Sequence, residues 1–247
     1  MSSPRIYHPG PLRSGQRIRL SEQAGRHVSQ VLRLKSGTAV VLFDGSGGEY
    51  PATLEQVTRR DVIVETGEHV AVERESPLSI TLIQGLSRGE RMDITLQKAT
   101  ELGVMQIVPM ETERCGVHLA AERKQKRQQH WQGVVIAACE QSGRNRVPEI
   151  QALTALQDYL AQTRDDGIAS VVLAPDAPQS LAAFSSTHGT QPLRILAGPE
   201  GGLSPDEIRL AMDFGFEAVH LGPRILRTET AGLAALAILQ GLAGDMK

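Results

Sequence analysis

Beyond residue 77, short apolar runs alternate with stretches of helical periodicity. Apolar runs of a length typical of strands occur at 80–83, 104–108, 170–173, 193–197 and 218–221. Helices are predicted over 90–102 and 120–141, where apolar side chains recur three or four positions apart, and Pro109 is expected to close the second strand. Apolar strands that alternate with helices indicate a mostly parallel sheet with helices on both faces, and so an α/β fold.

The first third of the chain has a different pattern. Short β-type runs, separated by turn signals rich in glycine, serine and aspartate, fall at 18–20, 39–43, 50–54 and 62–64. One helix is predicted between them, over 21–34, with Ser21 as its cap and an apolar face formed by Ala24, Val28, Val31 and Leu32. The charged segment 72–77 is typical of a linker. We therefore predict a small β-barrel over 1–73 and the α/β domain over 74–247.

Composition places the chain among ordinary globular proteins. Hydrophobic residues make up 40% of its 247 residues, the net charge is -2, and no apolar run reaches the ~18 residues of a membrane span. The N-terminus lacks the apolar core of an export signal, so we expect a cytoplasmic protein. The two cysteines, Cys115 and Cys139, and the spacing of the histidines give no basis for a disulfide framework or a metal site.

Positive charge is concentrated in two stretches. Residues 1–34 contain six arginines against one acid, and residues 114–146 contain seven basic residues against two acids, which leaves +5 in each stretch. On a chain of slightly negative net charge, this favours a surface that faces a polyanion such as nucleic acid. The alternative is that both stretches are solvated faces. An aromatic content of 3% argues against a base-stacking platform for single strands.

A glycine-rich loop, 198–204, follows the apolar run at 193–197. It leads into a helix that Ser204 and Glu207 begin as a capping box, with Pro205 at the first helical position. Glycines at the carboxyl end of a parallel strand let the backbone approach a ligand closely. The loop matches neither the phosphate-binding nor the dinucleotide-binding glycine motif. A glycine-rich turn without a ligand is the alternative.

A second loop, 221–231, leads from the last apolar run into an apolar C-terminal helix. Arg227 and Glu229 lie where that helix begins. An arginine at a helix N-terminus opposes the helix dipole, so helix stability does not explain Arg227. This favours a functional role, although an ion pair of Glu229 with Arg224 or Arg227 is a structural alternative.

The two loops together resemble one known family. Gly198-Pro199-Glu200-Gly201-Gly202, followed by Ile225-Leu226-Arg227-Thr228-Glu229-Thr230-Ala231, is similar to the RsmE-type methyltransferases, which methylate N3 of a uridine in small-subunit (16S) ribosomal RNA. The segments 97–104 and 138–144 also resemble that family, and Arg5-Ile6-Tyr7 and His27 with Val31-Leu32-Arg33 resemble its N-terminal barrel, so the likeness covers essentially the whole chain.

The resemblance implies more than the pattern does. It implies a SPOUT methyltransferase domain with a deep trefoil knot behind a PUA-like RNA-binding barrel, whereas the residues alone predict an unknotted doubly wound domain, because threaded chains are rare. It also implies a homodimer that binds S-adenosylmethionine and acts on ribosomal RNA, either naked or in the assembled subunit. The implied cofactor-binding residues are Leu173, Leu196, Gly198, Glu200, Gly201, Leu221, Gly222, Ile225 and Leu226.

The expected chemistry assigns roles to three residues. Uracil N3 is a poor nucleophile until it loses its proton, and the resulting anion spreads onto the carbonyl oxygens. Arg227 is our first candidate for stabilising that anion, and Glu200 or Glu229 for accepting the proton. The expected RNA contacts are Arg5, Arg33, Arg88, Lys124 and Arg144. Two other hypotheses remain: an α/β enzyme acting on a nucleotide or phosphorylated substrate, and a non-catalytic RNA-binding protein with a degenerate pocket.

Overall fold

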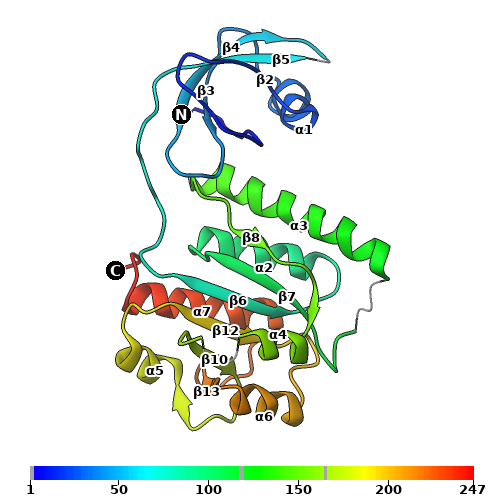
Figure 1. Ribbon diagram of the computed structural model, residues 1–247, viewed down its shortest axis with the longest axis vertical. Helices are drawn as coiled ribbons and strands as arrows, with labels where there is room; N and C mark the ends of the chain where they lie inside the picture. The colour runs from blue at the N-terminus through cyan, green and yellow to red at the C-terminus, as the bar shows by residue number, and fades with distance from the viewer. Residues whose placement is uncertain (1–2, 60, 117–119, 164–165) are drawn as a thin grey trace. The chain divides into compact units, whose positions relative to one another are not determined.

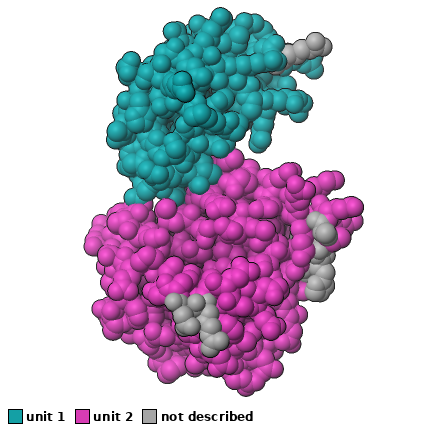
Figure 2. Space-filling view, in the orientation of Figure 1, with its two compact units in different colours: residues 1–75, 139–147 teal, residues 76–138, 148–247 magenta. Residues whose placement is uncertain are grey.

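A computed structural model describes residues 3–59, 61–116, 120–163 and 166–247. The chain divides into two compact units (Figure 1). Unit 1 contains residues 1–75 and 139–147, and unit 2 contains residues 76–138 and 148–247 (Figure 2). The predicted division at residue 73 does not foresee that 139–147 join unit 1. Within the described ranges, no helix has both the length and the apolar character needed to cross a membrane.

Unit 1 is built on a five-stranded mixed sheet in the order β1-β3-β4-β5-β2. Its strands are β1 (Arg5–Tyr7), β2 (Arg17–Arg19), β3 (Ala39–Phe43), β4 (Tyr50–Val57) and β5 (Val62–Thr66). Alternate residues face one apolar core, in which Ile6, Leu42 and Leu54 are fully buried. The four predicted strands are present. The strand β1 was not predicted, because three residues with a single aliphatic position show no periodicity.

The predicted N-terminal helix begins at its expected cap, Ser21, but ends early. It consists of α1 (Glu22–Arg26) followed by a single π-helical turn, η1 (His27–Val31). A π turn holds more residues than an α turn, so it rotates the residues beyond it away from the predicted apolar face. The prediction was therefore wrong for Val31 and Leu32, which are both exposed.

The segment 139–147 continues from the end of α3 (Ala121–Ser142) and packs within unit 1. The amide of Asn145 donates a hydrogen bond to the carbonyl of Val72 at 2.7 Å, and its carbonyl oxygen accepts one from the guanidinium of Arg5. The first strand and the linker are thus held by side chains that lie far away in sequence.

Arg144 was expected to contact RNA, but the structure buries it. Its side chain is 4% exposed, and its Nε donates to Glu75 Oε2 at 2.9 Å. Arg5 is likewise enclosed, because its guanidinium pairs with Glu49 as well as with Asn145. Both arginines therefore hold unit 1 together, and the structure does not support their assignment as phosphate contacts.

Replacing Arg144 by alanine should destabilise the chain rather than weaken RNA binding. The change leaves the Glu75 carboxylate, 10% exposed, without its counter-ion, at a cost of about 3 kcal/mol in the free energy of unfolding. Denaturant unfolding measures the loss. Arg146→Ala, which breaks a half-exposed pair with Glu73, is the matched control and should cost under about 1 kcal/mol. An Arg144→Ala variant of normal stability but weakened RNA binding would return Arg144 to the RNA surface.

Unit 2 contains an eight-stranded sheet in which each pair of neighbours is parallel. The strand order is β11-β13-β10-β12-β6-β7-β8, and β9 also pairs with β7. The strands are β6 (Ile80–Gly85), β7 (Gln106–Glu111), β8 (Glu149–Ile150), β9 (Thr154–Ala155), β10 (Ala169–Leu173), β11 (Gln179–Ser180), β12 (Leu193–Ala197) and β13 (Glu217–His220). The parallel sheet predicted from the apolar runs is confirmed.

Helices cover both faces of this sheet. They are α2 (Glu90–Glu101), α4 (Leu156–Gln162), α5 (Leu181–His188), α6 (Pro205–Asp213) and α7 (Thr228–Leu242), besides the first part of α3. Ile83 packs with residues of α4 and α6, whereas its neighbour Leu82 lies against Gly232 of α7. Because successive residues of a strand point to opposite faces, α4 and α6 cover one face and α7 the other, where α2 and α5 contact it.

Pro109 does not end its strand as predicted, because β7 continues to Glu111. The carbonyl of Ile107 points toward β8 and that of Met110 toward β6. Pro109 lies two residues after Ile107, so the backbone groups of both residues point to the same side of the strand. The N–H that Pro109 lacks would therefore face the gap where β8 has ended and β9 has not yet begun. A proline fits inside this strand because no ladder partner is present at that point.

Candidate functional site

A cavity of about 430 Å³ lies at the carboxyl ends of the neighbouring strands β10, β12 and β13. The loops that follow these strands form most of its walls. Open α/β sheets bind their ligands at this edge, and the volume lies within the range of small-molecule sites. The position and size of the cavity therefore mark a ligand site at the two loops that the sequence singled out.

Most of the predicted cofactor residues line this cavity. They are Leu173, Gly198, Glu200, Gly201, Leu221, Gly222, Ile225 and Leu226. Leu196 is not among the residues that line it, because its side chain is fully buried in the core beside Ile83 and Val172. A strand residue can be close in sequence to a site and still point into the core, since alternate side chains face opposite sides.

The loop after β12 is fixed at both ends. The predicted capping box is present: the hydroxyl of Ser204 accepts the backbone N–H of Glu207, whose carboxylate accepts the N–H of Ser204. At the other end, a methyl group on Gly198 would lie 2.9 Å from the backbone nitrogen of Leu203. Gly198 is thus required for the loop to fold back on itself, and it also lines the cavity.

Gly222 differs from Gly198, because open space surrounds it. Its φ of +112° is one that residues with side chains rarely adopt, and a methyl group built there meets no atom of the described structure within 4 Å. The backbone N–H of Gly222 donates to Nδ1 of His220 at 3.0 Å, which fixes the turn after β13. A side chain at this position would project into space that a ligand of the cavity could use.

Thr228 joins the two loops at a single buried hydroxyl. Its Oγ1 donates to the carbonyl of Gly198 at 2.7 Å and accepts from Nε2 of Gln84 at 3.1 Å. Gln84 lies near the end of β6 and is fully buried. The first residue of α7 is therefore tied both to β6 and to the loop after β12, and the two loops of the cavity are in direct contact.

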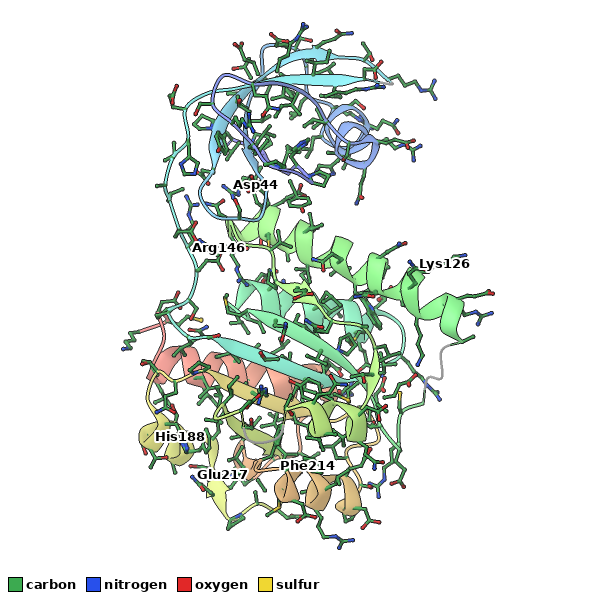
Figure 3. All side chains as sticks on the ribbon, viewed as in Figure 1. Asp44, Lys126, Arg146, His188, Phe214 and Glu217 are labelled. Carbon is green, nitrogen blue, oxygen red and sulfur yellow. The ribbon has the colours of Figure 1, made fainter. Side chains whose placement is uncertain are left out.

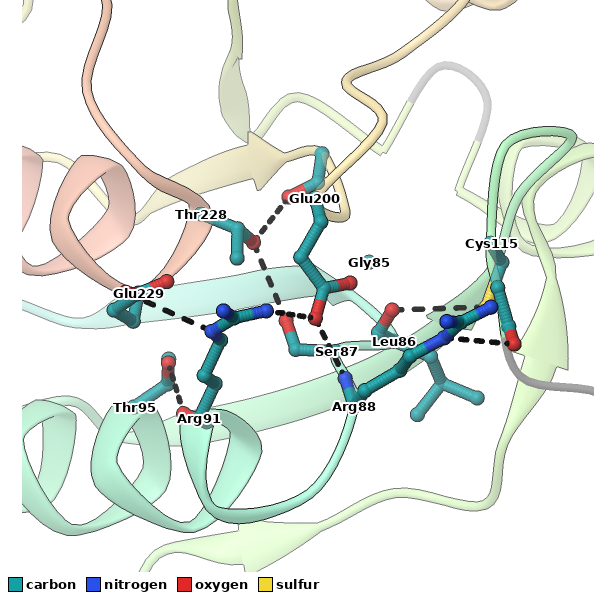
Figure 4. A network of polar contacts seen from close by, with 12 residues as sticks. Gly85, Leu86, Ser87, Arg88, Arg91, Thr95, Cys115, Glu200, Thr228 and Glu229 are labelled. Carbon is teal, nitrogen blue, oxygen red and sulfur yellow. Dashed lines mark hydrogen bonds and ion pairs between the residues drawn. The ribbon is translucent and has the colours of Figure 1, made fainter.

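The two predicted catalytic carboxylates share one cation (Figure 4). Arg91, in the first turn of α2, donates to Oε1 of Glu200 at 3.1 Å and lies 4.0 Å from Oε1 of Glu229. The backbone N–H of Arg88 donates to the same oxygen of Glu200 at 2.8 Å. The network fixes the loop after β12 and the start of α7 against the start of α2.

The environment of Glu200 favours its charged form. Burial by itself would raise the pKa of this carboxyl, but the N–H of Arg88 and the guanidinium of Arg91 outweigh it, and the pKa lies below the ordinary value. A carboxylate that binds protons weakly is a poor general base at neutral pH. Glu200 is therefore better suited to hold the loop and complement a cation than to remove a proton.

Arg227 occupies the N-cap position of α7, where it makes no side-chain capping bond. Serine, threonine, aspartate and asparagine are preferred at this position, and an arginine opposes the helix dipole. Its side chain is exposed, lines the cavity and has no polar partner in the part of the chain that the structure describes. The structural alternative, an ion pair with Glu229, is absent from these described residues, since Glu229 faces Arg91.

The remaining predicted RNA contacts lie in three different settings. Arg33 is exposed in unit 1, and Arg88 is exposed in unit 2, with its Nε on the carbonyl of Gly116 at 3.1 Å. Lys124 pairs with Glu111 at 2.9 Å. On the same helix, Lys126 projects outward (Figure 3) and lines a shallow hollow with Arg123, Arg127 and His130. In the described ranges, no three His, Cys, Asp or Glu side chains gather where a metal could be held.

Sequence reasoning missed the residues that connect the site. Gln84 carried one usable signal, because a glutamine directly after the apolar run Ile80–Ile83 is a polar residue on a buried strand. Thr228 lay inside a quoted motif but was given no role. Arg91 carried no signal of its own, because its partners are 109 and 138 residues away in the chain.

Two family models match the chain. A model described as an RNA methyltransferase domain covers residues 74–240, and one described as an RNA methyltransferase PUA domain covers residues 12–66. The second match agrees with the predicted PUA-like barrel and lies within unit 1.

Individual relatives give the same result. Ribosomal RNA small subunit methyltransferase E of Buchnera aphidicola from Schizaphis graminum is 32% identical, over 98% of both chains, and that of Bacillus subtilis is 31% identical, over 86% of this chain and 85% of its own. Two solved structures also superpose closely. A Legionella pneumophila protein in complex with the bound cofactor SAM has a TM-score of 0.94 at 40% identity, covering 99% of this chain and 100% of its own.

The second structure is ribosomal RNA small subunit methyltransferase E of Neisseria gonorrhoeae bound to S-adenosyl methionine. Its TM-score is 0.91 at 40% identity, and the match covers 100% of both chains. These likenesses extend over both units and include the two loops of the cavity. The chain belongs to the RNA methyltransferase domain family and, within it, to the ribosomal RNA small subunit methyltransferase E proteins.

Proposed function

We propose that this chain transfers a methyl group from S-adenosylmethionine to N3 of a uridine in small-subunit ribosomal RNA. The observation that carries the proposal is the cavity between the loops after β12 and β13, with Arg227 at its edge and without a polar partner in the described structure. The relatives named above support the reaction class, and two similar structures contain the cofactor.

The residues of the cavity fit such a cofactor. Leu173, Leu221 and Leu226 offer apolar walls for a planar ring system, while the glycines leave backbone polar groups accessible. The Glu200 carboxylate lines the cavity and would supply negative charge to attract a sulfonium or ammonium group. When bound, S-adenosylmethionine supplies an electrophilic methyl group on its sulfonium sulfur.

The protein contributes position and charge to the reaction. A substitution at carbon requires the acceptor nitrogen in line with the bond that breaks, so rigid loops contribute through orientation. Arg227 stabilises the uracil anion by hydrogen bonds from its planar guanidinium to a carbonyl oxygen. A cation that stabilises the anion also favours release of the proton to water, so no strong base has to line the cavity. Glu229, the other carboxylate candidate for accepting that proton, faces Arg91 and is not among the described residues that line the cavity.

The pKa of Glu200 gives this assignment a pH test. Because the folded-state pKa is lowered, the stabilising contribution of Glu200 is fully present above its ordinary value of 4.5 and is lost only as pH falls through the lower folded value. Glu200→Gln should therefore weaken cofactor binding yet leave the shape of the pH–rate profile between pH 6 and 8 unchanged. Single-turnover rates across that range measure this. Disappearance of an ascending limb in the variant would make Glu200 the base.

The partners and location are part of the proposal. We propose a homodimer, because Ile225, 85% exposed in the loop after β13, is an aliphatic side chain that a subunit contact would cover. We also propose that the protein works in the cytoplasm, where ribosomal RNA is modified.

Binding calorimetry with S-adenosylmethionine and with ATP separates the proposed methyltransferase function from that of an enzyme acting on a nucleotide. Incorporation of tritiated methyl groups into ribosomal RNA separates it from a non-catalytic RNA-binding protein.

The decisive experiment compares ribosomal RNA from a strain lacking the gene with that of its parent. Mass spectrometry should find one methyl-uridine missing from the small-subunit RNA and restored by the intact gene. Unmethylated subunits and naked RNA from the mutant strain then serve as alternative substrates for the purified protein. An unchanged set of methyl-uridines in the mutant would overturn the proposed function.

A further inference from the structure

The most unusual surface of unit 1 is the segment Ser29–Arg33, which we call the tip. Its two ends are anchored, because Val28 is fully buried and Leu34 packs against the same core. The N–H of Leu34 donates to the carbonyl of Val28 at 3.0 Å and closes the loop between them. Between these anchors, Val31 is 67% exposed and Leu32 is 37% exposed. Two adjacent aliphatic side chains are therefore presented to solvent by a firmly held base.

The backbone of the tip is strained at Arg33, a position where a glycine would remove the strain. Arg33 has a φ of +52°, and it is the only residue other than glycine with a positive φ in the described ranges. It follows the π turn at the place where helices commonly end on a glycine in this conformation. Strained positions of this kind and π turns both cluster at functional sites. A glycine would satisfy the fold better than Arg33, so the fold does not explain the side chain.

The charge around the tip indicates what it binds. Arg33 is exposed, and its guanidinium has no polar partner in the described structure. A hollow beside the tip is lined by Gln30 and by three arginines, of which Arg19 pairs with Asp61, Arg26 pairs with Glu22, and Arg59 has no ion pair among the described residues. Only one acidic residue, Glu22, lies among those that line it. Arg33 and Arg59 have no ion-pair partner among the described residues, and an aliphatic pair bordered by such cations complements a polyanion that also carries apolar surface.

We infer that the tip contacts an unstacked nucleotide of the substrate RNA, with Val31 and Leu32 against the base and Arg33 on its phosphate. Base faces are covered in an RNA duplex, whose deep groove does not admit side chains, so aliphatic groups find apolar surface only where a base is unstacked. The inference rests on the proposed function, because it names a second place, in unit 1, where the same RNA is held.

Two variants separate the roles of charge and apolar contact. Arg33→Gly should bind unmethylated small subunits several-fold more weakly, and the slope of log K against log salt should fall by about 0.7, the value of one lost contact to single-stranded phosphate. Its unfolding midpoint should be equal to or higher than that of the wild type, because glycine tolerates the backbone conformation. Val31→Ser combined with Leu32→Ser should weaken binding several-fold without changing the salt slope.

Controls identify each way in which the inference could fail. Arg13→Ala removes another exposed arginine of unit 1 and should leave affinity nearly unchanged. Loss of stability in Arg33→Gly, or wild-type affinity and slope in both tip variants, would overturn the inference while leaving methyl transfer intact. An altered sedimentation mass of the serine variant would make the tip a subunit contact and also overturn it. A wild-type chain that neither binds nor methylates the subunits would overturn the proposed function as well.

Discussion

Arg227→Ala should lower the rate of methyl transfer by about a hundredfold or more while leaving cofactor and RNA affinity nearly unchanged. The loss of one preorganised donor to a developing anion typically has an effect of this size on rate. Arg227 has the position for such a role, because it lines the cavity and its guanidinium has no polar partner among the described residues. Single-turnover methyl transfer at saturating RNA and cofactor measures the rate of the step itself.

Two further variants make this test specific. Arg227→Lys should recover little activity, because a compact ammonium lacks the planar pair of donors. Arg224→Ala removes an exposed arginine from the same loop and should cost much less, since only charge near the cavity is lost. A rate for Arg227→Ala within a few-fold of the wild type would exclude it from the mechanism. A monomeric variant would place its role at a subunit interface instead.

Gly222→Val should abolish cofactor binding in a chain that still folds. The added side chain enters the open space beside the turn after β13, where the proposed ligand would lie. The backbone strain of the substitution needs its own control, because φ at Gly222 is +112°. Gly215→Val supplies it: Gly215, beyond the end of α6, has a φ of +86° and is equally open, but it does not line the cavity.

Calorimetric titration with S-adenosylmethionine is the measurement for both valine variants. Gly215→Val should retain near-normal affinity despite reduced stability, while Gly222→Val should show no binding heat. Normal affinity in Gly222→Val would place the cofactor in another part of the molecule. Equal loss in both variants would attribute the effect to backbone strain.

Local sequence signals predicted the strands of the parallel sheet and the start of α6 well. The Ser204–Glu207 capping box and the apolar runs of the parallel sheet depend on neighbours within a few residues, so their pattern is visible along the chain. The π turn is different, because no residue type in 27–31 announces it and its extra residue rotates the side chains that follow away from the expected face. The prediction that Val31 and Leu32 belong to the apolar face of the helix was wrong for this reason.

Charge was the least predictable property of the site. A basic stretch in a sequence does not reveal which of its cations already has a partner: Arg144 is enclosed by Glu75, whereas Arg33 is exposed. The same limit applies to the cavity, whose glycine loops were found from their local pattern. Arg91, which holds Glu200 and Glu229 together, becomes visible only once the fold brings three distant segments to one point.

The make-up of unit 1 has a consequence for the order in which a nascent chain folds. Its strands are complete once Thr66 has been synthesised, yet Asn145, which holds both Arg5 and the backbone of Val72, emerges only much later. Unit 1 continues after Glu75 only at residue 139 and ends at Val147, 72 residues beyond Glu75. At translation rates of roughly 5 to 20 residues per second, this interval lasts about 4 to 14 s. During that time the N-terminal strands lack the contacts of residues 139–147, so unit 1 cannot be completed until residues 76–138 of unit 2 have been translated.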